Sequence, residues 1–216
     1  MDSLLDNKKY IMLSDITREI IETNMNDWVV DHYLGRIQCS LQDGEMPQYM
    51  IDIITKYAKI INPNAEFRYV SFVRYSNEFG YPQLGPHLDP PTQENFMFDI
   101  QIRSTLDWPI VVAHDEGIDN YTLKTNEALV LDITHQAHWR KPQKFKDGDY
   151  LDMLFLSYTD SKIEIPTIEW QSEVGLKHMD SYNEELALVY PEKEKLFQDN
   201  LETSVKDRII KQGQVR

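Results

Sequence analysis

Cysteine is nearly absent from this chain of 216 residues, with Cys39 as its single example. One thiol cannot form a disulfide within the chain, so the small disulfide-stabilised scaffolds of secreted proteins are excluded. A chain without a disulfide framework favours a reducing, intracellular compartment, and we expect a cytoplasmic protein.

Long apolar runs are missing as well. No stretch of the sequence approaches the ~20 apolar residues that a helix needs to span a bilayer. Residues 1–6 also lack the basic and then apolar layout of a signal peptide. We therefore expect neither a membrane partner nor a secretory signal.

Basic residues are in short supply, because 22 Lys and Arg stand against 36 Asp and Glu, for a net charge of −14. Proteins bind polyanions by neutralising phosphates with Lys and Arg, so this balance argues against nucleic acid as a direct partner. The net charge describes only the average surface and does not exclude a local basic groove around Arg103, Arg140 and Lys144.

The chain has the length of one domain and is long enough to bury a sizeable core. We expect residues 1–216 to form a single domain with three zones. Residues 1–64 would be a mainly helical support with a leading strand at 9–13. Residues 65–160 would be a β core, and residues 161–216 a C-terminal extension with a helix.

Apolar residues at helical spacing predict three helices. The first spans residues 15–24, and the second spans residues 47–61 with a proline in its first turn. The apolar stripe expected on the second helix consists of Met50, Ile53, Ile54, Tyr57, Ile60 and Ile61. A strongly charged third helix is expected from residue 184 to about residue 211, interrupted by a proline. Residues 38–45 are predicted to be a polar loop.

The middle of the chain contains many short apolar or alternating runs separated by turn signals. The runs expected to form strands are 67–75, 96–104, 108–113, 121–124, 128–131 and 150–158. Many short strands with few helical signals are typical of a jelly roll or a barrel. The predicted fold class is therefore mostly β with flanking helices.

The tripeptide His87-Leu88-Asp89 is the strongest chemical signal in the sequence. Alternate side chains of an extended strand share a face, so His87 and Asp89 can reach one metal ion while Leu88 points away. His138, beyond a later strand candidate, would complete two histidines and one carboxylate. Such a facial triad holds non-haem Fe(II) and leaves the opposite coordination face open.

The surroundings of these residues support a site at the end of a barrel. Residues 80–86 form a loop rich in Gly and Pro, and two further prolines follow Asp89. Proline restrains itself and the residue before it, which would keep this strand end from fraying. His135 lies three residues before His138 and remains an alternative third ligand.

The stretches 73–80, 86–89, 128–132, 138–140 and 153–158 together resemble a known family. The pattern is similar to the Fe(II)/2-oxoglutarate-dependent dioxygenases, and within them to the prolyl-hydroxylase-like branch. The matching part of the chain runs from about Phe67 to Asp160.

The resemblance implies a double-stranded β-helix core of the jelly-roll or cupin-like type. It implies that His87, Asp89 and His138 bind Fe(II), and that Tyr75 hydrogen-bonds the 2-oxoglutarate co-substrate. It further implies an oxygenase that consumes O₂ and hydroxylates a protein side chain or an amino acid, releasing succinate and CO₂, with ascorbate as a supporting reductant.

One departure from that branch concerns the cation that pairs with the far carboxylate of 2-oxoglutarate. The branch carries Arg or Lys on its closing strand, whereas residues 150–159 contain neither. A carboxylate in an apolar pocket needs a cation, and Arg binds both of its oxygens. Arg140 and Arg103 are the candidates, and Arg140 is preferred.

Two alternatives to a 2-oxoglutarate-dependent dioxygenase remain. They are a cupin-like metal enzyme that does not use 2-oxoglutarate and a non-catalytic jelly-roll interaction protein.

Overall fold

The computed structural model describes residues 28–42, 45–89, 95–114, 117–162, 167 and 173–191. These residues contain two long helices, α2 (Gln48–Ile61) and α4 (Met179–Val189), and ten strands. The strands are β1 (Val29–Asp31), β2 (Arg36–Gln42), β3 (Glu66–Ser76), β4 (Leu84–His87), β5 (Phe96–Ser104), β6 (Ile110–His114), β7 (Gly117–Tyr121), β8 (Ala128–Leu131), β9 (His138–Arg140) and β10 (Tyr150–Thr159).

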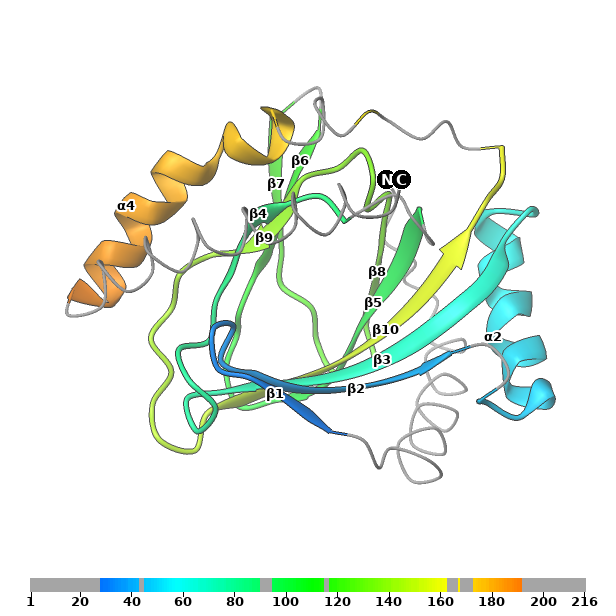
Figure 1. Ribbon diagram of the computed structural model, residues 1–216, viewed down its shortest axis with the longest axis horizontal. Helices are drawn as coiled ribbons and strands as arrows, with labels where there is room; N and C mark the ends of the chain where they lie inside the picture. Colours follow the sequence, from blue (N-terminus) through cyan, green and yellow to red (C-terminus); the bar gives the residue numbers. More distant parts are fainter. Residues whose placement is uncertain are drawn as a thin grey trace, which may run out of the picture.

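The strands form two antiparallel sheets that face each other (Figure 1). The large sheet has the order β1-β2-β3-β10-β5-β8, and the small sheet has the order β4-β9-β6-β7. From β3 to β10 the chain passes repeatedly between the two sheets, which is the arrangement of a double-stranded β-helix. The predicted fold class is therefore confirmed.

Side chains of the large sheet alternate between its two faces, as the period of a strand requires. The outer face packs against α2, which covers this sheet in Figure 1. The inner face, turned towards the small sheet, forms a separate apolar cluster with residues of β6. The inner-face cluster includes Val73, Tyr75, Met97, Ile110, Val112, Leu131, Leu151 and Met153.

Helix α2 confirms the predicted second helix, but its buried face differs from the predicted stripe. The buried residues are Met50, Ile51, Ile54 and Ala58, which recur at helical spacing. Ile60 is 58% exposed and Ile61 37% exposed, so including them in the stripe was wrong. The apolar residues of the last turn therefore remain at the surface.

Helix α4 covers the outer face of the small sheet (Figure 1). Tyr182 and Leu186 of α4 pack against Val111, Ala113 and Trp139 of the small sheet. The helix begins at Met179, several residues before the predicted start at residue 184, and ends at Val189, just before the predicted interruption by a proline.

The predicted polar loop over residues 38–45 is wrong, because most of it belongs to β2. Ile37, Cys39 and Leu41 alternate with polar residues, and this alternation is the signal of a half-buried strand. The strand predicted at 121–124 is also displaced, since β7 ends at Tyr121. The predicted strand at 9–13 and helix at 15–24 lie outside the described residues. In the described part of the chain, no helix is long and apolar enough to cross a membrane.

A buried carboxylate holds three strands together on the outer face of the large sheet. Asp152 of β10 is fully buried and pairs with Arg74 of β3 and Arg103 of β5. A β-bulge at Ile102 leaves that residue without a partner on β10 and sets Arg103 opposite Asp152. The bulge therefore turns Arg103 to the outer face.

Replacing Asp152 by Ala should lower the free energy of unfolding by about 3 kcal/mol, because two guanidiniums lose their shared buried partner. Asp107→Ala removes one side of the exposed Asp107–Lys124 pair and should cost less than about 1 kcal/mol. Chemical denaturation of both variants measures the difference. Equal losses would show that Asp152 is not a structural centre of the sheet.

Candidate metal centre

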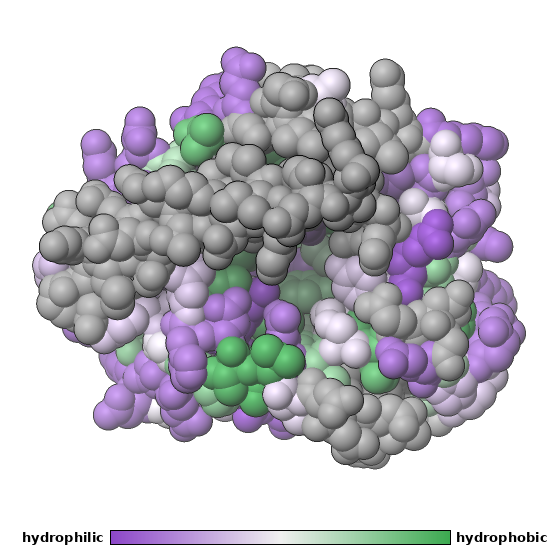
Figure 2. Space-filling view, in the orientation of Figure 1, coloured by the Kyte–Doolittle hydropathy of each residue, from purple (hydrophilic) through white to green (hydrophobic). Residues whose placement is uncertain are grey.

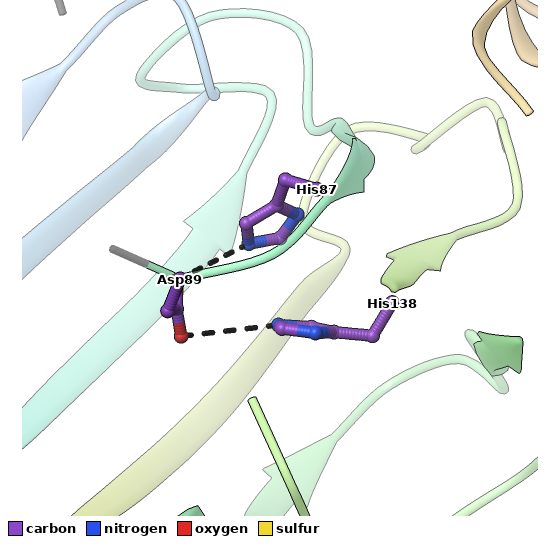
Figure 3. Close-up of side chains that lie close together, drawn as sticks. All are labelled: His87, Asp89 and His138. Atoms are coloured by element: carbon purple, nitrogen blue, oxygen red, sulfur yellow. Dashed lines mark ion pairs between the residues drawn. The ribbon is translucent and has the colours of Figure 1, made fainter. Parts of the chain in front are cut away.

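Three side chains from two separate parts of the chain converge between the sheets (Figure 3). Strand β4 pairs with β9 so that His87 lies directly opposite His138, and the two imidazole centroids are 4.3 Å apart. Asp89 follows the end of β4. One ligand atom from each of the three residues lies within 4.8 Å of the others.

The alternation within the tripeptide is as the sequence predicts. Leu88 is buried in the cluster beneath α4, while Asp89 turns to the opposite side. The backbone N–H of Asp89 donates to the carbonyl of Ile133, 2.9 Å away, which ties this turn to the segment after β8. The Asp89 carboxylate lies 3.6 Å from Nε2 of His87 and 4.0 Å from Nε2 of His138.

Backbone carbonyls orient both imidazoles. Nδ1 of His87 lies 2.8 Å from the carbonyl oxygen of Gly85, and Nδ1 of His138 lies 3.1 Å from that of Gln136. A carbonyl oxygen can only accept, so each Nδ1 donates its proton there, and each Nε2 is the ring nitrogen that faces Asp89 and could bind a metal. Metal-binding histidines show this arrangement, in which the second ring nitrogen is held by an outer partner.

The donor set fits a divalent transition metal. Two neutral imidazoles and one carboxylate on one side match the facial triad that holds Fe(II) in non-haem oxygenases. Among the described residues, these three form the only group of His, Cys, Asp or Glu side chains that could hold a metal ion.

The structure does not bring His135 to this group. His135 lies in the turn between β8 and β9, where its Nδ1 is 3.0 Å from a carboxylate oxygen of Asp132. Of the two histidines between which the sequence left a choice, only His138 converges with His87 and Asp89.

Arg140 shares the inner face of β9 with His138, because the two are separated by one residue. It is only 2% exposed. One Nη donates to the carbonyl of Trp108, and the other lies 3.5 Å from Sδ of Met153 on β10. Burial lowers the pKa of Arg140, and the negative charge of Asp99 opposes that effect. No described carboxylate forms an ion pair with Arg140.

Tyr75 lies on the inner face of β3 and is completely buried. Its hydroxyl accepts a hydrogen bond from Nη1 of Arg36 at 3.1 Å, and the Arg36 guanidinium lies 5.8 Å from the centre of the ring. Arg36 is opposite Tyr75 in the β2–β3 register. Sequence reasoning did not identify Arg36 as an interior cation, because β2 was not recognised as a strand.

Arg103 is not brought to the metal centre. Its side chain is 57% exposed and pairs with Asp152 on the outer face of the large sheet. The position therefore favours Arg140 over Arg103 as the cation for a bound carboxylate.

Asp99 is a site residue that the sequence reasoning missed. It lies on the inner face of β5 and is 3% exposed, and its Oδ1 has no hydrogen-bond partner. Burial raises the pKa of Asp99 to about 6, although Arg140 and His138 act in the opposite direction. The available signal was a lone acidic residue within the apolar run Phe-Met-Phe-Asp-Ile.

Comparisons with known proteins bear on the fold. Neither a protein-family model nor a curated protein sequence matches the chain. Among solved structures, the fold is similar to a prolyl-4-hydroxylase from Pseudomonas putida, with a TM-score of 0.53 and 11% identity over 74% of this chain and 90% of that chain. An oxidoreductase of the 2OG-Fe(II) oxygenase family from Burkholderia pseudomallei has a TM-score of 0.52 and 11% identity, over 71% and 80% of the respective chains.

At this level of identity the likeness establishes the fold. The chain has the double-stranded β-helix of prolyl-4-hydroxylase and 2OG-Fe(II) oxygenase structures. The fold that the sequence motifs led us to expect is thus confirmed, and it contains the His-Asp-His group as a possible metal site.

The buried charge of Asp99 predicts a pH-dependent stability in the metal-free protein. Its pKa rises from 3.8 to about 6 on folding, so the folded state loses stability as the pH rises through that interval. Asp99→Asn removes the charge and should be the more stable protein at neutral pH, by at most about 3 kcal/mol.

Urea denaturation of both metal-free proteins at several pH values measures this difference. The advantage of Asp99→Asn should grow between about pH 4 and about pH 6 and then level off. A variant that is less stable than the wild type at neutral pH would show that Asp99 has a strong ion partner.

Proposed function

We propose that this protein is an Fe(II)- and 2-oxoglutarate-dependent dioxygenase that hydroxylates a protein side chain or an amino acid. The observation that carries the proposal is the convergence of His87, Asp89 and His138, with both Nε2 atoms presented to one point. The fold supports the same class.

The three side chains would hold Fe(II) from one side and leave its opposite side open to ligands. Bound Fe(II), O₂ and 2-oxoglutarate would supply the oxidising chemistry, converting 2-oxoglutarate to succinate and CO₂ and placing one oxygen atom on the substrate. The carboxylate of Asp89 lowers the positive charge of the site. The carbonyls of Gly85 and Gln136 keep both imidazoles oriented during turnover.

Arg140 would anchor the far carboxylate of 2-oxoglutarate. The guanidinium is buried, lacks an ion pair to any described carboxylate, and lies against Met153 of β10. Strand β10 carries no basic residue, whereas the prolyl-hydroxylase-like branch carries its cation on the closing strand. Arg140 would supply this cation from β9, because its guanidinium lies against Met153 of β10. Tyr75 is the proposed hydroxyl partner on the neighbouring strand β3.

The apolar inner-face cluster around this site would exclude water. Trp108, Leu151 and Met153 are almost completely buried. In such surroundings the attraction between a guanidinium and a carboxylate is stronger than in water. Bound 2-oxoglutarate would thus be held at both ends, by the metal and by Arg140.

His138→Ala should abolish the visible charge-transfer band that appears when 2-oxoglutarate is added anaerobically to the Fe(II)-loaded protein. The band requires both bound metal and a chelating keto acid, and His138 supplies one of three ligands. His135→Ala is the matched control and should retain the band. Absorbance titration of the three proteins measures both effects.

Other results of this titration would change the assignment. Fe(II) retention by the wild type without the band would indicate a cupin-like metal enzyme that does not use 2-oxoglutarate. Failure to retain Fe(II), Mn(II) or Ni(II) would indicate a non-catalytic jelly-roll protein.

Arg140→Met should weaken 2-oxoglutarate binding by about 100-fold, because a buried carboxylate loses its charge-assisted partner. Arg103→Met removes a guanidinium from the outer face and should change the affinity less than about 3-fold. The dissociation constants come from the same anaerobic titration. A larger effect at Arg103 than at Arg140 would contradict the proposed anchor.

A further inference from the structure

The inner wall of the large sheet carries an acidic group that neither the metal nor the co-substrate requires. Asp99 stands opposite Phe155 of β10 and Leu129 of β8 in the strand register. Met153, which Arg140 contacts, is two residues from Phe155 along β10. Two residues span about 7 Å along a strand. The Asp99 carboxylate and the Arg140 guanidinium therefore lie beside neighbouring inner-face residues of β10.

The carboxylate of Asp99 is buried without sufficient partners. It is 3% exposed, and Oδ1 is fully enclosed with no hydrogen-bond donor. Native proteins satisfy nearly all buried polar atoms, and an exception calls for an explanation, such as a function or a missing ligand. An ionised carboxylate is the most costly group to leave in this state.

Internal partners do not account for this residue. The two Nη groups of Arg140 are directed to the carbonyl of Trp108 and to Sδ of Met153. No ion pair joins Asp99 to any described cation, and Asp99 is not part of the three-residue metal group. Its electrostatic neighbours are Arg140, His138 and Asp89, which places it within the field of the metal centre.

The acidic group of Asp99 is not needed to balance the charges of the proposed site. A divalent metal, the Asp89 carboxylate, dianionic 2-oxoglutarate and the Arg140 guanidinium balance one another. Arg36, the other cation on the inner face, has its own acidic neighbour in Asp31 at 3.9 Å, so Asp99, when ionised, adds a negative charge that the cationic group of a substrate would compensate. Of the components still to bind, O₂ is neutral, so the substrate is the one that could bring this cation.

We propose that Asp99 is the substrate-recognition residue and that it binds a cationic ammonium or guanidinium group. The substrate would therefore be a basic side chain or a basic amino acid. This inference rests on the proposed dioxygenase function. The net charge of −14 fits it, because an acidic protein attracts basic substrates at long range.

The space-filling view shows where such a group could approach. In the orientation of Figure 1, the described surface is hollowed between the two sheets, and both hydrophilic and hydrophobic residues line the hollow (Figure 2). A basic side chain would suit such a hollow, since its alkyl stem can contact apolar residues while its charged end turns to an acidic partner.

Matched pairs of small probes test the proposal. N-acetyl-arginine methylamide and N-acetyl-lysine methylamide are cationic, and the corresponding citrulline and acetyl-lysine compounds are neutral. The Mn(II)-loaded protein with 2-oxoglutarate should enhance proton relaxation of a bound probe near the metal. The Fe(II)-loaded protein reports succinate formation with the same probes.

The wild type should favour one of the cationic probes over its neutral partner by about 10- to 100-fold, as expected for a charged hydrogen bond. Asp99→Asn should lose this preference, and Asp99→Ser serves as a second variant if the first does not fold. Asp107→Asn removes one exposed negative charge and should keep the preference. Thermal unfolding verifies that each variant is folded.

Absence of a preference in the wild type, including failure of every probe to bind, would overturn the role of Asp99. A preference that survives in Asp99→Asn would overturn it as well. Failure of the proposed function has a different signature, because the wild type would then lack the charge-transfer band with 2-oxoglutarate. The failure of the role of Asp99 can thus be distinguished from the failure of the proposed function.

Discussion

The antiparallel pairing of β4 with β9 is the constraint on which the candidate site depends. It places His87 opposite His138, so two imidazoles from distant parts of the chain become neighbours without any special loop. The carbonyls of Gly85 and Gln136 then direct both Nε2 atoms towards Asp89. His87 and His138 are thus positioned by backbone pairing between two strands, and Asp89 follows directly after the first of them.

The interior between the sheets is organised by charge as well as by packing. Arg140 and Asp99 are both almost completely buried, yet they make no direct ion pair. Burying isolated charges is unfavourable, and a protein retains them where a ligand supplies the missing partner. The arrangement suits a site that receives an anion at Arg140 and a cation at Asp99, each beside the candidate metal centre.

Much of this architecture could be predicted from local sequence patterns. The strands β5 and β8 have the predicted bounds, and the tripeptide at His87 alternates as expected because the period of a strand is a local property. Strand β2 was missed although Ile37, Cys39 and Leu41 alternate, since polar residues between them gave the segment the composition of a loop. Arg36, an interior cation, was missed with it.

The sequence by itself determined the short-strand pattern of a jelly roll and the shared face of His87 and Asp89, because both follow from neighbouring residues. Only the tertiary structure decided which distant groups join them. Strand register brought His138 rather than His135 to the site, a bulge at Ile102 turned Arg103 outward, and inner-face packing buried Arg140 beside Met153. Register and bulges depend on pairing between remote strands, and no local pattern encodes that pairing.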